Sequence, residues 1–264
     1  FTRYSSDGTT PIVPIEVPGL DSSTVRWVDY DVDGYVDLFI TGRMRTRSRH
    51  DSTGKAFITA GSKNAMLRNT PSETGISHVF VLDTGEFTGV DQIKPIHGGG
   101  VAWGDFDRNG MPDLAITGVS LIAKQGDRFH REAYTILYFN GKEDGTPGKI
   151  TRNQLIALPK RHDGDVAWGD FDKDGLLDLA ICGRDVTGID QPASDEGNII
   201  LQVYLNQEEG LFAEAKGILE QKYAISGKLG WIDFDNDGWL DLVAMGDAHT
   251  LSGTTASLRV FKNI

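Results

Sequence analysis

Aspartate residues recur in four short segments of the chain with one shared spacing, D-x-D-x-[DN]-G-x-x-D. Side chains at positions one, three and five converge on one point when the chain turns tightly, and glycine at position six permits that turn. Position seven can offer a backbone carbonyl, and position nine adds a last carboxylate. Neighbouring carboxylates repel one another unless a cation lies between them. An all-oxygen ligand set of flexible geometry favours Ca²⁺ over Mg²⁺, so the spacing predicts about four calcium sites.

The predicted calcium ligands occupy the same five positions of every segment. They are, in chain order, Asp29, Asp31, Asp33, the Tyr35 carbonyl and Asp37; Asp105, Asp107, Asn109, the Met111 carbonyl and Asp113; Asp170, Asp172, Asp174, the Leu176 carbonyl and Asp178; and Asp233, Asp235, Asp237, the Trp239 carbonyl and Asp241. One such segment alone would equally suit a plain Asp-Gly turn. Four segments with identical spacing favour metal binding. The pattern opens like an EF-hand loop but closes at position nine instead of twelve, which excludes a helix–loop–helix calcium sensor.

Each acidic segment lies inside a longer repeat. Residues 101–118 and 166–183 are identical at 13 of 18 positions, and residues 25–42 and 229–246 follow the same template. Short alternating runs flank each acidic segment, and a further run that ends in Asn follows it, at 65–69, 135–140, 201–206 and 258–263. Such runs, bounded by Gly and Asn, predict β-strands. A fourth, less regular strand is expected at 78–83 or 87–96, at 149–158 and at 211–219.

Four strands in each unit predict an all-β chain built as a β-propeller. The four blades of four antiparallel strands are expected at about 25–96, 97–160, 161–226, and 227–264 together with 1–24, so that residues 1–264 form a single domain. The last unit has only three strands of its own, and the N-terminal strand is expected to close its blade. Closure would remove an exposed sheet edge. A segment of a larger, seven-bladed propeller could have the same arrangement of strands at its two ends, so this architecture stays as the alternative.

Aromatic residues hold two further repeat positions. Trp27, Trp103, Trp168 and Trp231 precede the first Asp of each segment by two residues, and Tyr30, Phe106, Phe171 and Phe234 follow that Asp directly. The tryptophans could line a ligand channel, but packing between blades suits them better. The second set is expected to wedge between neighbouring blades.

The composition excludes several classes of protein. Lys and Arg total 26 against 38 Asp and Glu, which gives a formal charge of −12. That balance argues against binding of nucleic acid or an anionic membrane surface, since both need a basic footprint. No apolar run reaches the roughly 18 residues of a membrane span, so no direct membrane insertion is expected. The 32 glycines of the 264 residues favour many tight turns and almost no helix.

The repeats resemble the FG-GAP/VCBS repeats of the integrin-α-like β-propeller family, whose blades carry D-x-D-x-D-G-x-x-D-L between their first and second strands. The resemblance covers all four units. It implies a Ca²⁺ ion in each first hairpin on one face of the propeller and ligand contacts on the opposite face. Two features depart from the family, which usually has seven blades: the literal Phe-Gly…Gly-Ala-Pro signature is absent, and Asn109 lowers the charge of one site.

Candidate ligand-contacting residues lie away from the acidic segments. Arg43, Arg45, Arg47 and Arg49 form a basic stretch in the loop between the second and third strands of the first blade. Arginines at alternate positions of an extended ribbon point to one side and suit carboxylate or sulfate groups, although a solvated hairpin would look the same. His97 and His162 fall in equivalent loops before first strands and are candidates for the same face.

These observations predict a calcium-binding extracellular or cell-surface propeller that serves as an adhesion, recognition or scaffold module for a protein or glycan. No nucleophile or zinc motif points to catalysis, so no enzyme is expected. Millimolar extracellular calcium can load sites of modest affinity. Three alternatives remain open: a lectin-like propeller, a calcium-dependent polysaccharide-active enzyme such as a lyase, and a self-assembling subunit whose N-terminal strand completes the last blade of a neighbour.

Overall fold

The structure is a computed structural model, and its regular elements are β-strands. The residues that it describes are 19–45, 49–50, 56–57, 60–72, 78–83, 85, 92–123, 129–185, 199–217, 225–250 and 253–264. No α-helix is present among these residues. The prediction of an all-β chain is confirmed.

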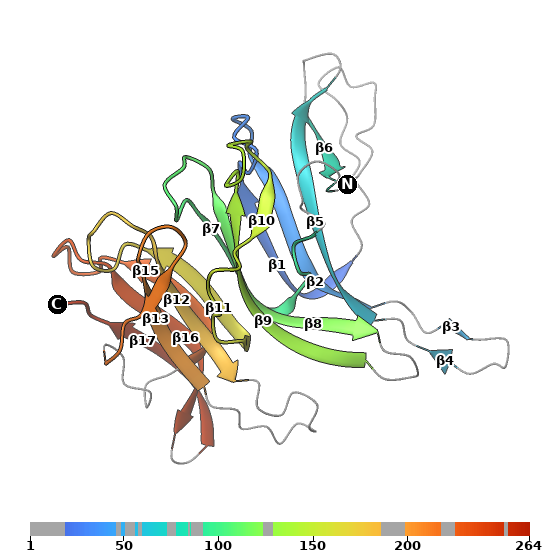
Figure 1. The fold of residues 1–264 in the computed structure, drawn as a ribbon. Helices are drawn as coiled ribbons and strands as arrows, with labels where there is room; N and C mark the ends of the chain where they lie inside the picture. Colours follow the sequence, from blue (N-terminus) through green and yellow to red (C-terminus); the bar gives the residue numbers. More distant parts are fainter. Residues whose placement is uncertain are drawn as a thin grey trace, which may run out of the picture.

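Four antiparallel sheets follow one another along the chain, and in each sheet strands that are neighbours in sequence pair (Figure 1). The first contains β1 (Leu20–Val28), β2 (Asp37–Arg45), β5 (Ala60–Pro71) and β6 (His78–Asp83); the second contains β7 (His97–Gly104), β8 (Asp113–Ala123), β9 (Phe129–Asn140) and β10 (Ile150–Arg152). The third contains β11 (Arg161–Gly169), β12 (Asp178–Asp185), β13 (Ile199–Asn206) and β14 (Phe212–Glu214); the fourth contains β15 (Ile225–Ile232), β16 (Asp241–Thr250) and β17 (Gly253–Phe261). A separate pair, β3 (Arg49–His50) with β4 (Ala56–Phe57), lies in the long connection of the first sheet.

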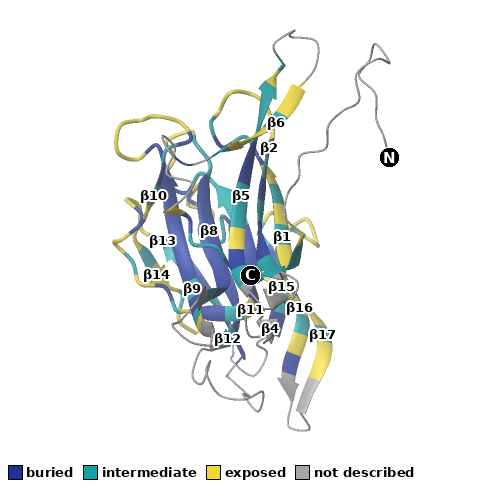
Figure 2. Ribbon diagram, turned by 90° about the vertical axis from the view of Figure 1, so that its right-hand side faces the viewer, coloured by how far each residue is buried: buried dark blue, intermediate teal, exposed yellow. Residues whose placement is uncertain are grey.

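The hydrophobic core lies between successive sheets. We call these interfaces the first junction (first and second sheets), the second junction (second and third) and the third junction (third and fourth). Phe39 packs on Leu114 at the first, Phe106 on Leu179 at the second, and each junction has its own cluster of buried side chains. In Figure 2 the buried residues fill β8 and β9, whereas β6 and β17 are largely exposed.

The predicted packing between sheets is confirmed for Trp103, Trp168 and Trp231 and is wrong for Trp27. Trp168 donates its indole N–H to the Ala102 carbonyl at 3.3 Å, and Trp231 does the same to Ala167 at 3.2 Å, each across a junction. Trp103 packs edge-on against Phe39, with ring centroids 5.8 Å apart. Trp27 belongs to the first sheet and is 61% exposed, because no described sheet precedes it.

The aromatic residues of the acidic segments follow the same rule. Tyr30 and Phe106 are buried in the first and second junctions, and Phe171 is partly buried in the third. Phe106 stacks on Trp168 with ring centroids 5.3 Å apart. The prediction is wrong for Phe234, which is 50% exposed because no sheet covers that side of the fourth sheet.

Closure of the propeller is not confirmed. The four sheets form an open row in Figure 1, and the fourth sheet has three strands among the described residues. Residues 1–18, expected to supply its outer strand, lie outside the described residues. The sequence repeat therefore yields repeated sheets, while the number of blades in a closed ring stays a prediction.

The outer strand of the first sheet matches one of its two predicted positions, whereas those of the second and third sheets are shorter than the sequence indicated. In the first sheet the fourth strand is at 78–83, and residues 92–96 are not in a strand. The second sheet ends its outer strand at Arg152, because the Asn153 carboxamide oxygen accepts the Leu155 N–H at 2.8 Å and turns the chain. In the third sheet the turn bond from Lys216 N–H to the Glu214 carbonyl ends the strand, against an expected 211–219.

Candidate metal centres

The four acidic loops share one backbone conformation, and each connects the first strand of a sheet to its second. The fourth loop residue has a positive φ in every copy: Val32 56°, Arg108 59°, Lys173 61° and Asn236 58°. The sixth is always a glycine with positive φ: Gly34 88°, Gly110 87°, Gly175 84° and Gly238 87°. Because L-residues rarely adopt this region, the invariant glycine of the repeat has a clear physical cause.

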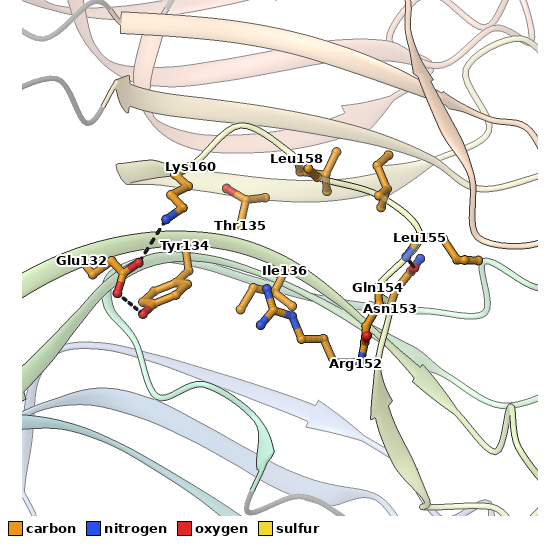
Figure 3. Close-up of a pocket in the computed structure, with 12 residues that line it drawn as sticks. Glu132, Tyr134, Thr135, Ile136, Arg152, Asn153, Gln154, Leu155, Leu158 and Lys160 are labelled. Carbon is orange, nitrogen blue, oxygen red and sulfur yellow. Dashed lines mark hydrogen bonds and ion pairs between the residues drawn. The ribbon is translucent and has the colours of Figure 1, made fainter.

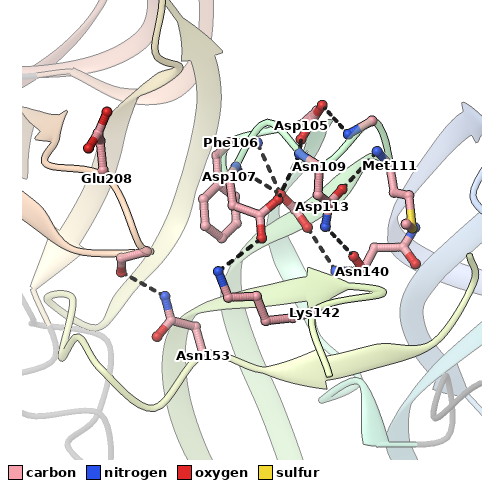
Figure 4. A network of polar contacts seen from close by, with 12 residues as sticks. Asp105, Phe106, Asp107, Asn109, Met111, Asp113, Asn140, Lys142, Asn153 and Glu208 are labelled. Carbon is pink, nitrogen blue, oxygen red and sulfur yellow. Dashed lines mark hydrogen bonds and ion pairs between the residues drawn. The ribbon is translucent and has the colours of Figure 1, made fainter. Parts of the chain in front are cut away.

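The first aspartate of each loop accepts hydrogen bonds from the backbone that turns around it. In the second loop, Asp105 accepts the N–H of Asn109 at 3.0 Å and of Gly110 at 2.9 Å (Figure 4). Asp29 and Asp233 accept the equivalent pair, and Asp170 accepts the N–H of Gly175. These bonds fix the first carboxylate at the centre of the loop.

The fifth residue of each loop tightens the turn with its own side chain. The Asn109 carboxamide oxygen accepts the Met111 N–H at 2.9 Å, and the carboxylates of Asp33, Asp174 and Asp237 accept the N–H two residues further on. This local bond is the Asx turn that Asp and Asn favour. Asn can therefore replace Asp in the second loop without loss of the turn.

The ninth residue ties the loop to the third strand of its sheet. Asp113 is fully buried; its Oδ2 accepts the Phe106 N–H at 3.0 Å, and its Oδ1 accepts the Asn140 N–H at 2.7 Å. Asp37, Asp178 and Asp241 make the same two kinds of bond. Burial raises the pKa of Asp113 to about 8 and the pKa values of Asp37 and Asp178 to about 6, although the backbone donors oppose the shift.

Three acidic residues of each loop bring one carboxylate oxygen each within 4.8 Å of one another. We call these groups the first to fourth acidic clusters; they consist of Asp29, Asp31 and Asp33; Asp105, Asp107 and Asp113; Asp170, Asp172 and Asp178; and Asp233, Asp235 and Asp241. Each cluster could hold a metal ion. The first cluster uses the fifth loop residue, whereas the other three use the ninth.

The remaining predicted ligands are not in these groups. Asp37, Asp174 and Asp237 lie in the same loops but outside the 4.8 Å groups. Asn109 donates its amide to the Asn140 carbonyl at 2.8 Å, so its oxygen is left for the turn. The four backbone carbonyls of position seven stay predicted ligands.

Several cluster oxygens are buried without a hydrogen-bond donor. They are Oδ1 of Asp31, Oδ2 of Asp107 and Oδ1 of Asp170. A buried carboxylate oxygen that lacks a donor is costly. An oxygen-binding cation would satisfy all three atoms, so the chemistry of these loops fits a hard metal ion.

Basic side chains lie at three of the four acidic clusters. Arg68 Nε is 3.3 Å from Asp31, Lys142 Nζ is 3.4 Å from Asp107 Oδ2, and Lys262 contacts Asp235 and lies 3.3 Å from Asp237. No ion pair is found for the third acidic cluster within the described part of the chain. These cations offset part of the negative charge and would compete with a metal ion.

The candidate ligand-contacting residues lie at the other end of the first strands. Arg43 Nε pairs with Asp21 at 2.6 Å, and His162 Nδ1 lies 2.9 Å from Asp163. His97 is 6% exposed, and its Nδ1 shares a 2.9 Å hydrogen bond with the Ser62 hydroxyl. Arg45 lies in β2 and Arg49 in β3, while Arg47 lies outside the described residues.

Sequence reasoning missed the role of the asparagine that ends each third strand. Asn140, Asn206 and Asn263 each donate a side-chain N–H, at 2.7 to 2.8 Å, to the acidic loop of the preceding sheet. The repeated Asn was visible in the sequence, but its partner lies about 100 residues away, at a separation of 110, 100 or 92 positions. A repeat position held by a polar residue at the end of an apolar strand was the available signal.

A groove on the second sheet, beside β9, could not be predicted from the sequence. It encloses about 790 Å³ and is bounded by β9, β10 and the segment that leads into β11 (Figure 3). Tyr134 forms its floor, with Lys94 Nζ 4.7 Å and Lys160 Nζ 5.6 Å from the ring centroid. Glu132 accepts bonds from the Tyr134 hydroxyl and, at 3.0 Å, from Lys160. Arg152 adds a further positive charge to the lining.

Comparison with known proteins adds no identification. No protein-family model matches the chain, and no curated protein matches it either. Within the described residues, no helix has the length and apolar character needed to cross a membrane.

Proposed function

We propose that the chain is a calcium-binding β-propeller of the FG-GAP/VCBS type that acts outside the cell as an adhesion, recognition or scaffold module. One observation carries the proposal: the same loop conformation gathers three carboxylate oxygens within 4.8 Å at four equivalent places. Turn formation alone does not need such clusters, because the fifth residue and the glycine already make the turn.

Calcium is the cation that best suits these loops. The donors are carboxylate oxygens on a flexible turn, with backbone carbonyls at position seven as further ligands, and Ca²⁺ accepts six to eight oxygens at variable geometry. Mg²⁺ demands near-ideal octahedral geometry and keeps several waters. Extracellular calcium is concentrated enough to fill sites of modest affinity, which favours an extracellular location and a structural role without catalysis.

Calcium binding can be tested by calorimetric titration of chelator-treated protein and by thermal unfolding with and without Ca²⁺. We expect heat of binding, and a melting temperature that rises with calcium but much less with magnesium, since ligand binding to the folded state adds stability. Asp170→Asn removes a ligand of the third acidic cluster and should lower the number of sites by one. Asp144→Asn, an exposed acid outside the loops, is the matched control. Absence of heat and an unchanged melting temperature would refute the proposal.

The groove beside β9 supports a second candidate function, that of a lectin. The Tyr134 ring beside Lys160, with Arg152 elsewhere in the lining, suits a saccharide that carries a carboxylate or sulfate, because the ring can stack on sugar C–H groups and the cations can pair with the anion. Tyr134→Leu should abolish binding on a glycan array, whereas Leu211→Ala, exposed elsewhere on the surface, should not. Cleavage of a bound glycan would instead favour the polysaccharide-active enzyme.

A further inference from the structure

The side-chain amide of the third-strand asparagine has two hydrogens with two separate uses. In the second sheet, Asn140 donates one to the Pro112 carbonyl of its own sheet at 3.0 Å and the other to the Tyr30 carbonyl of the first sheet at 2.7 Å. In the third sheet, Asn206 donates to its own Leu177 at 3.2 Å and to Phe106 of the second sheet at 2.8 Å. Every junction therefore has a donor face on one sheet and an acceptor loop on the sheet before it.

The first sheet presents a donor face that meets no acceptor among the described residues. Asn69 donates to the carbonyl of Val36 in its own sheet at 3.2 Å, and its second amide hydrogen has no partner among the described residues. Trp27 and Val25, on the same face, are 61% and 46% exposed. At the other junctions the residue equivalent to Val25 is Val101 or Val166, and these are 1% and 3% exposed.

The fourth sheet presents the matching acceptor face, which meets no donor within the described ranges. Phe234, equivalent to Tyr30 and Phe106, is 50% exposed, and no asparagine amide reaches its carbonyl in the described part of the chain. Leu258 and Val260 are 66% and 49% exposed. Their equivalents in the third sheet, Leu201 and Val203, are each 2% exposed because the fourth sheet covers them.

We propose that the donor face of the first sheet binds the acceptor face of the fourth sheet in a second copy of this chain. Asn69 of one copy would donate to the Phe234 carbonyl of the other, Trp27 would insert beside it, and Leu258 would be covered. The contact repeats a design that the chain already uses three times, and this continuity with the existing junctions is what supports it.

Two copies can satisfy both faces at once. The two faces lie at opposite ends of the row of sheets (Figure 1), so each copy offers a donor face at one end and an acceptor face at the other. A two-fold axis then creates two identical junctions and leaves no unpaired face. The resulting ring would have eight sheets, at the upper end of the roughly four to eight blades that propellers contain. This inference does not rest on calcium binding or on a ligand.

Sedimentation velocity of the full chain, over a range of micromolar concentrations, tests the proposal. We expect a dimer, and we expect Trp27→Glu or Leu258→Glu each to raise its dissociation constant about tenfold or more, since a buried charge disrupts an apolar contact. Leu155→Glu places the same charge on an exposed leucine away from both faces and should leave the dimer intact. Circular dichroism and thermal unfolding verify that the variants are folded.

Mixing the two variants tests the pairing of the faces. Trp27→Glu retains a normal acceptor face and Leu258→Glu retains a normal donor face, so an equal mixture should form heterodimers with one intact junction. If the interface instead paired two identical faces, mixing the two variants would not restore dimers. A wild-type chain that is monomeric, with Trp27 protected from a fluorescence quencher, would overturn the proposal in favour of self-closure. Long open polymers would overturn the two-fold ring.

Discussion

Lys142 lies with its ammonium nitrogen 3.4 Å from Oδ2 of Asp107, inside the second acidic cluster. The carboxylate side chain is 2% exposed, and Oδ2 is otherwise without a hydrogen-bond partner. The lysine therefore contacts an oxygen that a calcium ion in this cluster would also need, so the two cations would compete for it. Arg68 and Lys262 hold comparable positions at the first and fourth clusters. The four clusters should therefore differ in calcium affinity, according to how closely a basic side chain approaches each one.

Replacement of Lys142 by methionine should strengthen calcium binding at the second cluster. The change removes a positive charge that repels the ion and leaves the carbon stem. The calcium affinity of this one site should therefore rise about fivefold or more, because even in water Coulomb's law gives about 1 kcal/mol for each pair of unit charges 4 Å apart. Calorimetric titration measures it. Lys149→Met removes a lysine that pairs with Asp144 outside the cluster and is the matched control. Equal calcium affinities for Lys142→Met and Lys149→Met would show that Lys142 does not compete with the ion.

The buried amide of Asn206 should contribute substantially to stability. Its side chain donates to the carbonyls of Phe106 and Leu177 and accepts the N–H of Glu208 at 3.0 Å, all in a site only 2% exposed. At about 1 kcal/mol for each hydrogen bond, Asn206→Ala should lower the free energy of unfolding by roughly 3 kcal/mol. Urea denaturation measures the loss.

Asn69→Ala is the matched control for that prediction, because Asn69 holds the same repeat position on the open face. Among the described residues its side chain makes one bond, to Val36, and the variant should cost less than about 1 kcal/mol when measured at concentrations where the chain is monomeric. Similar losses for both variants would show that the bond across the junction adds little.

The repeat, the acidic loops and most strands could be predicted from the sequence, because each depends on local spacing. The turn at Gly110 and the strand that ends at Asn140 are encoded within a few residues. The second bond of Asn140, to Tyr30, could not be predicted, since it depends on how two sheets pack. The angle between sheets is set by the volumes of side chains such as Trp168 and Phe106, and no local pattern reports it.

The candidate site shows the same division. Spacing placed the carboxylates of Asp105 and Asp107 together, and the structure brings them within one cluster. Spacing did not reveal that Asp113 is buried and accepts three backbone N–H bonds, or that Lys142 reaches the cluster from beyond the third strand. Side chains that arrive from a distant part of the chain decide how strongly each site binds.

Val32 should be a point of backbone strain in the first acidic loop. It has φ of 56°, a region that costs L-residues about 1 to 2 kcal/mol and that a β-branched side chain tolerates poorly. The equivalent residue of the fourth loop is Asn236, which suits this region. Val32→Asn should therefore stabilise the fold by about 1 kcal/mol in thermal unfolding.

Val36→Asn supplies the comparison for the strain prediction. Val36 is 49% exposed, close to the 46% of Val32, but is not among the residues with positive φ. The same change there should give no gain. A gain at both positions would mean that the stability comes from replacing an exposed valine with a polar side chain and not from relief of backbone strain.

His97 should make the fold sensitive to mild acid. Burial lowers the pKa of the imidazole to about 4, with the positive charges of Arg43 and Arg131 adding to the shift and Asp21 and Asp163 opposing it. The unfolded chain protonates this histidine near its ordinary pKa of 6.5, while the folded chain keeps it neutral. The contribution of neutral His97 to the free energy of unfolding is therefore complete above pH 6.5. It falls as the pH drops towards 4, by as much as roughly 3 kcal/mol.

The acidic loops also titrate in this range, so the contribution of His97 is the difference between wild type and His97→Asn in urea denaturation at several pH values. The variant lacks the titrating ring and should lose less stability between neutral pH and pH 4. Ser62→Ala removes the 2.9 Å hydrogen-bond partner but leaves the ring buried, so it should keep the steep wild-type pH dependence. Parallel pH profiles for wild type and His97→Asn would mean that the histidine gains its proton without unfolding the sheets around it.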